Sequence, residues 1–375
     1  MNTLRVVLFS GGRGGTDALT ELVHVTGVQT SVIVNGFDDG KSTGEIRSLV
    51  HEIWGPSDFR KVGTSVLQAV GHSWADVFEE RGLFSGGSPE LAIREMRTRL
   101  GPHLPTASVE RLIEASLDFW EITRSALSSG VMADMALGNT VLTGLFLRLG
   151  DFETALAEYQ QLLGVPPNVK IINVFDGSPS VLGAATNAYS VDSEHGIVES
   201  PAPEPIQDLF FHDDFSAIAL AGQWQNRSGL RRTPLPVGHH QLSPLATSAL
   251  EKSDVVIVAP GTRHSSTLPS LQFKTKFAPK RMKQILVMMN GSRDFDFHES
   301  ETVVDEVRKI SSAMLLHPGL QEVKVSFLFA GVRADSDWAN PGHIAELRER
   351  GVLVHTVTSA ARHGPISAAL GPYLL

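Results

Sequence analysis

The sequence predicts an α/β protein with a Rossmann-like, three-layer, doubly wound and mainly parallel sheet that carries a helical insertion. Two observations predict this fold. Short apolar runs rich in β-branched residues recur along the chain and are bounded by glycine or polar turns, as in parallel strands covered on both faces. Helical patterns fall between these runs, and such alternation implies right-handed crossovers. We expect residues 1–375 to form a single domain.

The expected strands begin at the amino terminus with residues 4–9, directly before a helical pattern at 16–25. The other apolar runs lie at 30–35, 254–259, 284–290, 323–330 and 352–358. Residues 71–165 differ, because strand patterns are absent and amphipathic helix formers dominate, so this stretch is predicted to be a helical insertion. The proline-rich stretch 199–207 is predicted to be a surface loop.

The composition of the chain argues against several classes of protein. Hydrophobic residues make up 42% and charged residues 19% of the chain, which is typical of a globular protein. The net charge of -9 argues against a nucleic-acid-binding surface, and the lack of cysteine excludes disulfides and thiol chemistry. The first residues lack the features of a signal peptide, and no apolar run is long enough to span a membrane. We therefore expect a soluble, cytoplasmic protein without nucleic-acid or membrane partners.

A glycine-rich turn, "FSGGRGGTDAL" (9–19), follows the first expected strand and precedes a helix. Such a turn lets phosphate approach backbone N–H groups at a helix N-terminus, where the dipole favours anions. The spacing differs from the dinucleotide G-x-G-x-x-G pattern. Gly11, Gly12 and Gly14 are therefore candidate phosphate-binding residues, and the alternative is a plain tight turn.

A second turn of this kind, "APGTRHSSTLPSL" (259–271), follows another expected strand. Gly261 would allow close approach, Thr262 and Ser265 can donate to phosphate oxygens, and Arg263 would supply charge. The alternative is an ordinary junction between a strand and a helix.

The stretch "VNGFDDGKSTGEIR" (34–47) contains Gly40-Lys41-Ser42, as at the end of a P-loop. Gly36 leaves one residue too few for that loop, and Asp38 and Asp39 would repel phosphates unless a cation lay between them. A P-loop is therefore not the preferred interpretation.

The acidic pair predicts a magnesium site instead. Asp38 and Asp39, with Asp58 nearby, could hold a divalent cation, because magnesium is usually bound by one or two carboxylates and substrate phosphates. Adjacent side chains of an extended segment point in different directions, so one of the pair could be the ligand. Basic neighbours could neutralise a diphosphate, and these are Lys41, Arg47, Arg60 and Lys61. The alternative is a solvated charged loop.

Other polar residues give weaker patterns. Asn139, after Gly138, precedes an apolar helix and is either an N-cap or an amide that contacts a nucleobase or ribose. None of the pairs and neighbours among His195, His212, His239 and His240 has zinc-type spacing, so these side chains are predicted to be surface or satisfied histidines.

Four stretches, in order, resemble the 2-phospho-L-lactate transferase (CofD) superfamily, and within it the YvcK-like gluconeogenesis factors that bind nucleotide sugars. They are "GGRG", "DDGKSTGEIR" with "GPSDFRKV", "GNTVLTGL" and "ALEKSDVVIVAPGTRHSSTLPSL". The resemblance reaches to about residue 310. It implies a Rossmann-like sheet with a helical insertion, usually dimeric, that binds a nucleoside diphosphate-containing molecule across the strand ends.

The resemblance also implies roles for single residues. Gly11, Gly12 and Gly14 match one phosphate loop, and Gly261 and Thr262 match the other. Asp38 and Asp39 match the acidic pair near the transferred phosphate, and Gly138 and Asn139 match a turn that contacts the nucleotide. The chain departs from the pattern where Lys41 replaces glycine, Lys61 replaces asparagine and His264 replaces tyrosine. These departures leave the substrate open.

The resulting hypothesis is a magnesium-dependent transferase that moves a phosphoester-linked group from a nucleoside diphospho-donor to an acceptor hydroxyl and releases nucleoside monophosphate. Its candidate catalytic residues are Asp38, Asp39 and His264, with Asp39 or His264 as a base if one is needed. Its candidate binding residues also include Lys41, Asp58, Arg60 and Ser265. The alternative is a non-catalytic, nucleotide-sugar-binding regulator of the YvcK-like kind.

Overall fold

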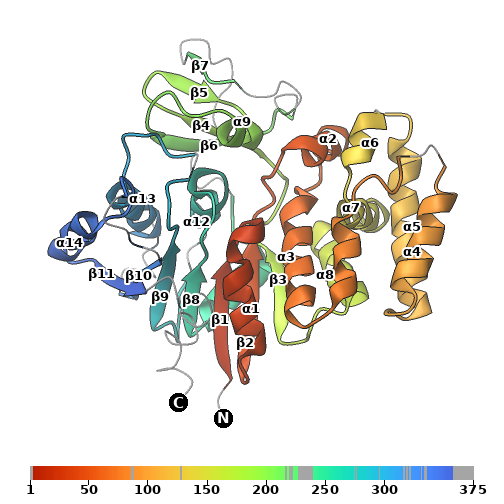
Figure 1. Ribbon diagram of the computed structural model, residues 1–375, viewed down its shortest axis with the longest axis horizontal. Coiled ribbons are helices and arrows are strands. Elements are labelled where there is room, and N and C mark those ends of the chain that lie inside the picture. The colour runs from red at the N-terminus through yellow and green to blue at the C-terminus, as the bar shows by residue number, and fades with distance from the viewer. Residues whose placement is uncertain are drawn as a thin grey trace.

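A seven-stranded, fully parallel sheet forms the centre of the molecule (Figure 1). The computed structural model describes residues 3–85, 88–126, 129–215, 218, 223–226, 240–273, 275, 277–294, 296–315, 317, 320, 322–330, 332 and 336–357. The strand order is β11-β10-β9-β8-β1-β2-β3. The strands are β1 (Leu4–Phe9), β2 (Val28–Val34), β3 (Val169–Asn173), β8 (Val255–Val258), β9 (Gln284–Met289), β10 (Lys324–Ala330) and β11 (Leu353–Val357). The predicted α/β fold is confirmed.

Buried aliphatic side chains explain the sheet. Val255–Val258 is buried throughout, and Val32 to Val34 at the end of β2 are fully enclosed. Both faces of the inner strands are therefore covered, as their continuous apolar runs predict. Each predicted strand run coincides with a strand to within two residues at either end, whereas β3 was not predicted.

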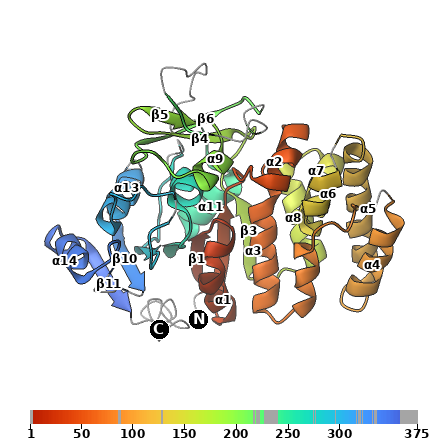
Figure 2. The ribbon, with the colours of Figure 1, turned by 45° about the horizontal axis from the view of Figure 1, so that its top comes forward.

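Helices cover the sheet on both faces. Figure 1 shows α1 in front of β1 and β2, with α3 next to α1 on the side of β3, and Figure 2 shows α11 behind the sheet. The helices and helical turns outside residues 71–165 are η1 (Gly12–Gly15), α1 (Thr16–His24), α2 (Lys41–Leu49), α3 (Pro56–Ala69), α9 (Glu194–Glu199), α11 (Pro244–Lys252), η4 (Arg263–Thr267), α12 (Leu268–Leu271), α13 (Val303–Leu315) and α14 (Pro341–Glu349).

A block of helices lies beside the β3 edge of the sheet (Figure 1, right). It consists of η2 (Ser73–Glu79), α4 (Glu90–Leu100), α5 (Thr106–Thr123), α6 (Ser129–Asp134), α7 (Leu137–Leu149) and α8 (Phe152–Leu163). Helices α5 and α7 cross closely, because a Cβ atom on Gly144 would lie 1.7 Å from the carbonyl oxygen of Ala115. Residues Arg81 and Asp134 at the upper end of this block lie near the carboxyl ends of the strands.

A second, antiparallel sheet of order β6-β4-β5-β7 lies above the carboxyl ends of the parallel strands (Figure 1, top). Its strands are β4 (Val181–Ala185), β5 (Tyr189–Val191), β6 (Asp208–His212) and β7 (Gln225–Asn226). Helix α9 joins it on the side that faces the parallel sheet. This small sheet was not predicted from the sequence; together with α9 we call it the roof.

The order of the strands creates a switch point between β1 and β8. The chain leaves β1 toward β2 on one side and leaves β8 toward β9 on the other, although β1 and β8 are paired neighbours. Ligands of doubly wound sheets bind in the crevice outside the carboxyl ends of the strands at such a point. The loops after β1 and β8 are therefore the expected place for a ligand.

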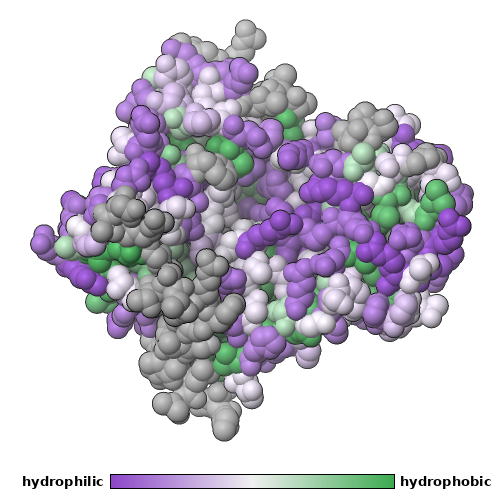
Figure 3. All heavy atoms as spheres, in the orientation of Figure 1, coloured by the Kyte–Doolittle hydropathy of each residue, from purple (hydrophilic) through white to green (hydrophobic). Residues whose placement is uncertain are grey.

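Some earlier predictions fall outside the described residues, namely those for residue 358 of the last predicted strand and for His239. Among the helices that the structure describes, none is both long and apolar enough to cross a bilayer. Figure 3 shows a mainly hydrophilic face on which hydrophobic side chains form small, separate patches.

Candidate functional site

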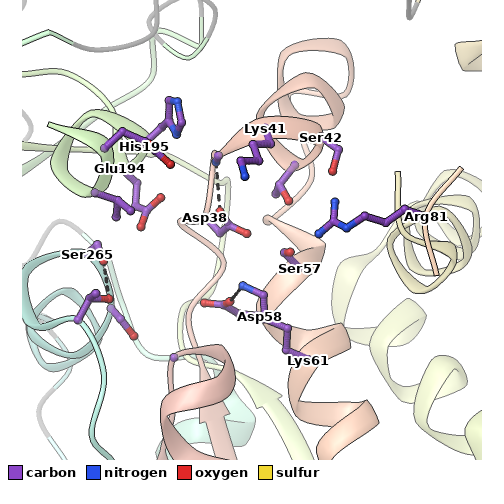
Figure 4. A pocket seen from close by; sticks show the side chains of 17 residues that line it. Asp38, Lys41, Ser42, Ser57, Asp58, Lys61, Arg81, Glu194, His195 and Ser265 are labelled. Carbon is purple, nitrogen blue, oxygen red and sulfur yellow. Dashed lines mark hydrogen bonds and ion pairs between the residues drawn. The ribbon is translucent and has the colours of Figure 1, made fainter. Parts of the chain in front are cut away.

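A cleft of ≈ 290 Å³ opens at the carboxyl ends of the parallel strands, beneath the roof. Its walls come from the loop after β1, the loop after β2 with the start of α2, the first turn of α3, α9 and η4. Figure 4 shows Asp38 near its centre, with Glu194 and His195 on one side and Arg81 on the opposite side. The lining residues are Gly11, Asp38, Gly40, Lys41, Ser42, Thr43, Ser57, Asp58, Lys61, Arg81, Glu194, His195, Val198, Glu199, Thr262, Ser265 and Ser266.

The two glycine-containing turns pack against each other at the switch point. A Cβ atom on Gly11 would lie 1.4 Å from Ser266 Oγ, and one on Gly14 would lie 2.1 Å from the carbonyl oxygen of Pro260. Glycine is thus required for this approach. The turns place the backbone of Gly11 and the hydroxyl groups of Thr262 and Ser265 along one wall of the cleft. Gly12, Gly14 and Gly261 shape the turns and do not line the cleft.

This packing gives a first testable result. Gly14→Ala should separate the two turns, destabilise the protein by about 1–3 kcal/mol and weaken ligand binding in the cleft, because the added methyl group meets backbone and not a flexible side chain. Chemical denaturation and calorimetry measure the two effects. Gly63→Ala is the matched control, since its Cβ atom would meet nothing closer than 3.6 Å. Equal ligand affinity in both variants would contradict the importance of the contact between the turns.

The two adjacent aspartates have different positions. Asp38 is half-buried, lines the cleft and accepts a hydrogen bond from the Gly40 N–H at 3.1 Å. Asp39 is buried and points away, and its carboxylate accepts the N–H groups of Glu194 at 3.1 Å and His195 at 2.6 Å. Burial raises the pKa of Asp39 to about 7, against the opposing effect of Arg47. Asp39 therefore holds α9 in place, which corrects its assignment as a catalytic and metal-binding residue at the cleft.

Four acidic side chains line the cleft, and these are Asp38, Asp58, Glu194 and Glu199. Burial raises the pKa of Glu194 well above its ordinary value, and the nearby charges of Asp38, Asp39 and Asp58 raise it further. Lys61 is the neighbouring cation, with its Nζ atom 2.8 Å from Asp58 Oδ1. Burial alone would lower the pKa of Lys61, but Asp58 and Asp38 raise it above its ordinary value.

This arrangement fits a divalent cation that shares its ligands with a bound phosphate. Like charges at close range favour either protonation or a bound cation between them. In the described part of the chain, no three His, Asp or Glu side chains lie close enough together to hold a metal by themselves. Magnesium commonly takes one or two carboxylates and completes its shell with water and phosphate oxygens. Asp38 and Asp58 are the side chains that would hold it here.

His264 lies outside the cleft, which corrects its assignment as a catalytic residue. Its ring is buried against Phe297, its backbone N–H donates to Asp296 Oδ2 at 2.7 Å, and its Nε2 atom lies 3.0 Å from Lys309 Nζ. The adjacent Arg263 is buried too and does not face a ligand. Both side chains turn inward because η4 packs against α13 and the carboxyl end of β9.

Arg60, Gly138 and Asn139 also lie outside the cleft, in contrast to the prediction that they bind the nucleotide. Arg60 is buried and donates to Asn139 Oδ1 and to Glu79 Oε1, both at 3.0 Å. Gly138 has no room for a side chain, because a Cβ atom would lie 2.5 Å from Arg60 Cγ. This polar group connects α3 to the helical block.

Glu194 and His195 also line the cleft, and neither is among the site residues predicted from the sequence, which indicates for His195 a surface or satisfied histidine. Ser193 caps α9, with its side chain accepting from the Gly196 N–H at 3.1 Å, and this "SEHG" cap was the available signal. The prediction for His212 agrees with its buried hydrogen bond to the Asp192 carbonyl at 2.9 Å. Ser57 and Arg81 were also missed.

Comparison with known families identifies the chain's relatives. The family model described as 2-phospho-L-lactate transferase CofD matches residues 6–316. The chain belongs to this family. Membership of the CofD family agrees with the resemblance seen in the motifs and supports a transferase-like function. A comparison with curated protein sequences finds no match.

Solved structures support the same fold. A protein of the UPF0052 family from Bacillus halodurans has a TM-score of 0.62 and 17% sequence identity, over 96% of this CofD-family chain and 93% of that chain. A second crystal structure of that Bacillus halodurans protein has a TM-score of 0.59 and 18% identity, over 95% of this chain and 93% of that one. At this identity the similarity shows the shared fold.

Proposed function

We propose that the protein is a magnesium-dependent transferase that binds a nucleoside diphospho-donor in the cleft and moves its phosphoester-linked group to an acceptor hydroxyl. The observation that carries this proposal is the meeting of two glycine-containing turns at the switch point, directly beside Asp38 and Asp58. Backbone N–H groups and hydroxyl groups of the turns suit a diphosphate. The acidic centre suits the metal that a diphosphate brings with it.

In the proposed reaction the acceptor oxygen forms a bond to phosphorus, the bond from that phosphorus to the bridging oxygen breaks, and nucleoside monophosphate leaves with the bridging oxygen. Bound magnesium would supply positive charge for the phosphate oxygens. Lys61 adds a fixed positive charge beside Asp58, and the turns orient the diphosphate. The acceptor proton passes to a base, and Glu194 fits this role, because it lines the cleft and burial raises the pKa of its carboxyl group, which makes the carboxylate a stronger base.

A non-catalytic nucleotide-sugar-binding regulator is the second candidate function. It is favoured by the positions of Asp39 and His264, because both predicted base candidates are buried outside the cleft. The two functions share the diphosphate site and differ in whether an acceptor hydroxyl is activated.

One experiment separates the two functions. Thermal shift with nucleoside diphosphates and nucleotide sugars, with and without MgCl₂, identifies the tightest ligand, since a ligand of the folded state raises its stability. That ligand is then incubated with the protein, MgCl₂ and a panel of hydroxyl acceptors, and nucleoside monophosphate is measured by chromatography. Acceptor-dependent release of monophosphate supports the transferase. Tight binding with intact ligand identifies the regulator, and no binding at millimolar concentration rejects both.

A further inference from the structure

Lys41 has an unusual backbone conformation at the edge of the cleft. Its φ angle is 46°, and it is the one non-glycine residue with positive φ in the described part of the chain. A side chain is unfavourable in this left-handed conformation, whereas glycine adopts it without a steric penalty. Strained backbone of this kind is concentrated at functional sites.

The Lys41 side chain has no partner among the residues that the structure describes. It is exposed, and it forms no hydrogen bond or ion pair with any residue that the structure describes. The two other long cations of the cleft are paired. Lys61 Nζ lies 2.8 Å from Asp58 Oδ1, and Arg81 Nη1 lies 2.8 Å from Asp134 Oδ1. Lys41 is thus a strained residue whose charge remains available to a ligand.

The position of Lys41 indicates what that ligand group is. Lys41 begins α2 and lies at the rim beside Asp38, on the side of the cleft opposite Ser57 and Asp58 (Figure 4). Hydroxyl groups of Ser42 and Ser265 line the same cleft, and both are suited to phosphate oxygens. An ammonium group among such donors binds an anion better than a neutral group.

We propose that Lys41 is a ligand-binding residue, whose ammonium group contacts anionic oxygens of the donor's diphosphate and whose strained backbone is retained for this contact. This inference rests on the proposed function, since it assumes a diphosphate in the cleft. Lys41 then makes the protein more selective for ligands with a full diphosphate over those with a single phosphate.

The test compares Lys41→Gly and Lys41→Arg with Lys252→Gln, a matched control that removes an exposed charge from α11, outside the cleft. Without ligand, Lys41→Gly should melt about 2 °C higher than the unchanged protein, because glycine relieves the strain. With ADP, GDP, UDP and CDP as probes in MgCl₂, the Kd of the tightest binder should rise about 10-fold in Lys41→Gly. Lys41→Arg should stay within about 3-fold, and Lys252→Gln should match the unchanged protein.

Two further measurements, of salt dependence and of monophosphate affinity, test the same inference. The difference in Kd between Lys41→Gly and the unchanged protein should shrink as NaCl rises from about 50 mM to about 500 mM, because salt screens an exposed charge. The matching nucleoside monophosphate should lose less affinity than the diphosphate. Equal diphosphate affinity in Lys41→Gly and the unchanged protein overturns the inference and leaves the proposed function standing. Absence of binding to every diphosphate in the unchanged protein overturns both.

Discussion

Replacing Asp38 by asparagine should lower magnesium-dependent turnover by at least about 100-fold, while the protein stays folded. Asp38 is the half-buried carboxylate at the centre of the cleft, and it is one of the two side chains proposed to hold magnesium. Asparagine keeps an oxygen that can accept the Gly40 N–H, so the local turn is preserved. What disappears is the negative charge.

The measurements are nucleoside monophosphate release and the dependence of nucleotide affinity on MgCl₂. The loss should fall mainly on kcat, because a metal that stabilises developing charge acts on the chemical step more than on substrate binding. Glu45→Gln is the matched control, since Glu45 is an exposed carboxylate on the same helix, α2, and does not line the cleft. Unchanged magnesium dependence in Asp38→Asn would remove Asp38 from the metal site.

Replacing Arg263 by methionine should destabilise the protein by about 3–5 kcal/mol, because it breaks a fully buried ion pair. Arg263 pairs with Glu306, and their side chains are 0% and 1% exposed. Arg263 also donates to the carbonyl oxygens of Ala259 at 3.0 Å and Met288 at 2.7 Å. It therefore holds η4 to the carboxyl ends of β8 and β9, next to the cleft.

The stability of Arg263→Met should depend on pH, because Glu306 remains buried without its partner. Burial already raises the pKa of Glu306, and Arg263 opposes that shift. Without Arg263, folded Glu306 retains its proton to higher pH than unfolded Glu306. The folded state then holds more protons, so the stability of Arg263→Met should fall as pH rises above the ordinary glutamate range near 4.5.

Denaturant unfolding at pH 5 and pH 8 measures both effects. The double variant Arg263→Met/Glu306→Met should be more stable than Arg263→Met, because no buried charge is left without a partner. The exposed pair of Arg97 and Glu110 is the matched comparison, and Arg97→Met should change the free energy of unfolding by less than about 1 kcal/mol. Additive losses in the double variant would argue against a coupled pair.

Much of the fold could be predicted because buried parallel strands have a strong sequence pattern. Strand β8 (Val255–Val258) is apolar at every position, and all of its residues are buried. Strand β3 was missed because the exposed Lys170 interrupts its apolar run. The roof was missed because three of the five residues of β4 are Gly or Ala, and because β5 and β7 have only 3 and 2 residues. Such strands are recognised by their pairing partners, which lie elsewhere in the chain.

The site was predictable where the backbone defines it. Gly11 and Gly14 are needed for the close approach of two turns, and that need is visible as glycine at a strand end. Which way a side chain faces was harder to predict. Asp38 and Asp39 are chemically alike, and only the packing of α9, 155 residues later in the chain, turns Asp39 away from the cleft. For the same reason Glu194 and His195 could not be assigned to the cleft before the chain was folded.

Two adjacent residues, Asp38 and Asp39, connect the cleft to the roof. Asp38 faces the space where a ligand would bind, and Asp39 holds the first two N–H groups of α9. Arg47 adds a second anchor, since its Nη2 atom donates to the Ser180 carbonyl at 2.5 Å, just before β4. A ligand that displaced Asp38 would therefore also displace the carboxylate of Asp39 that holds α9. We expect ligand binding in the cleft and the position of the roof to be coupled through this dipeptide.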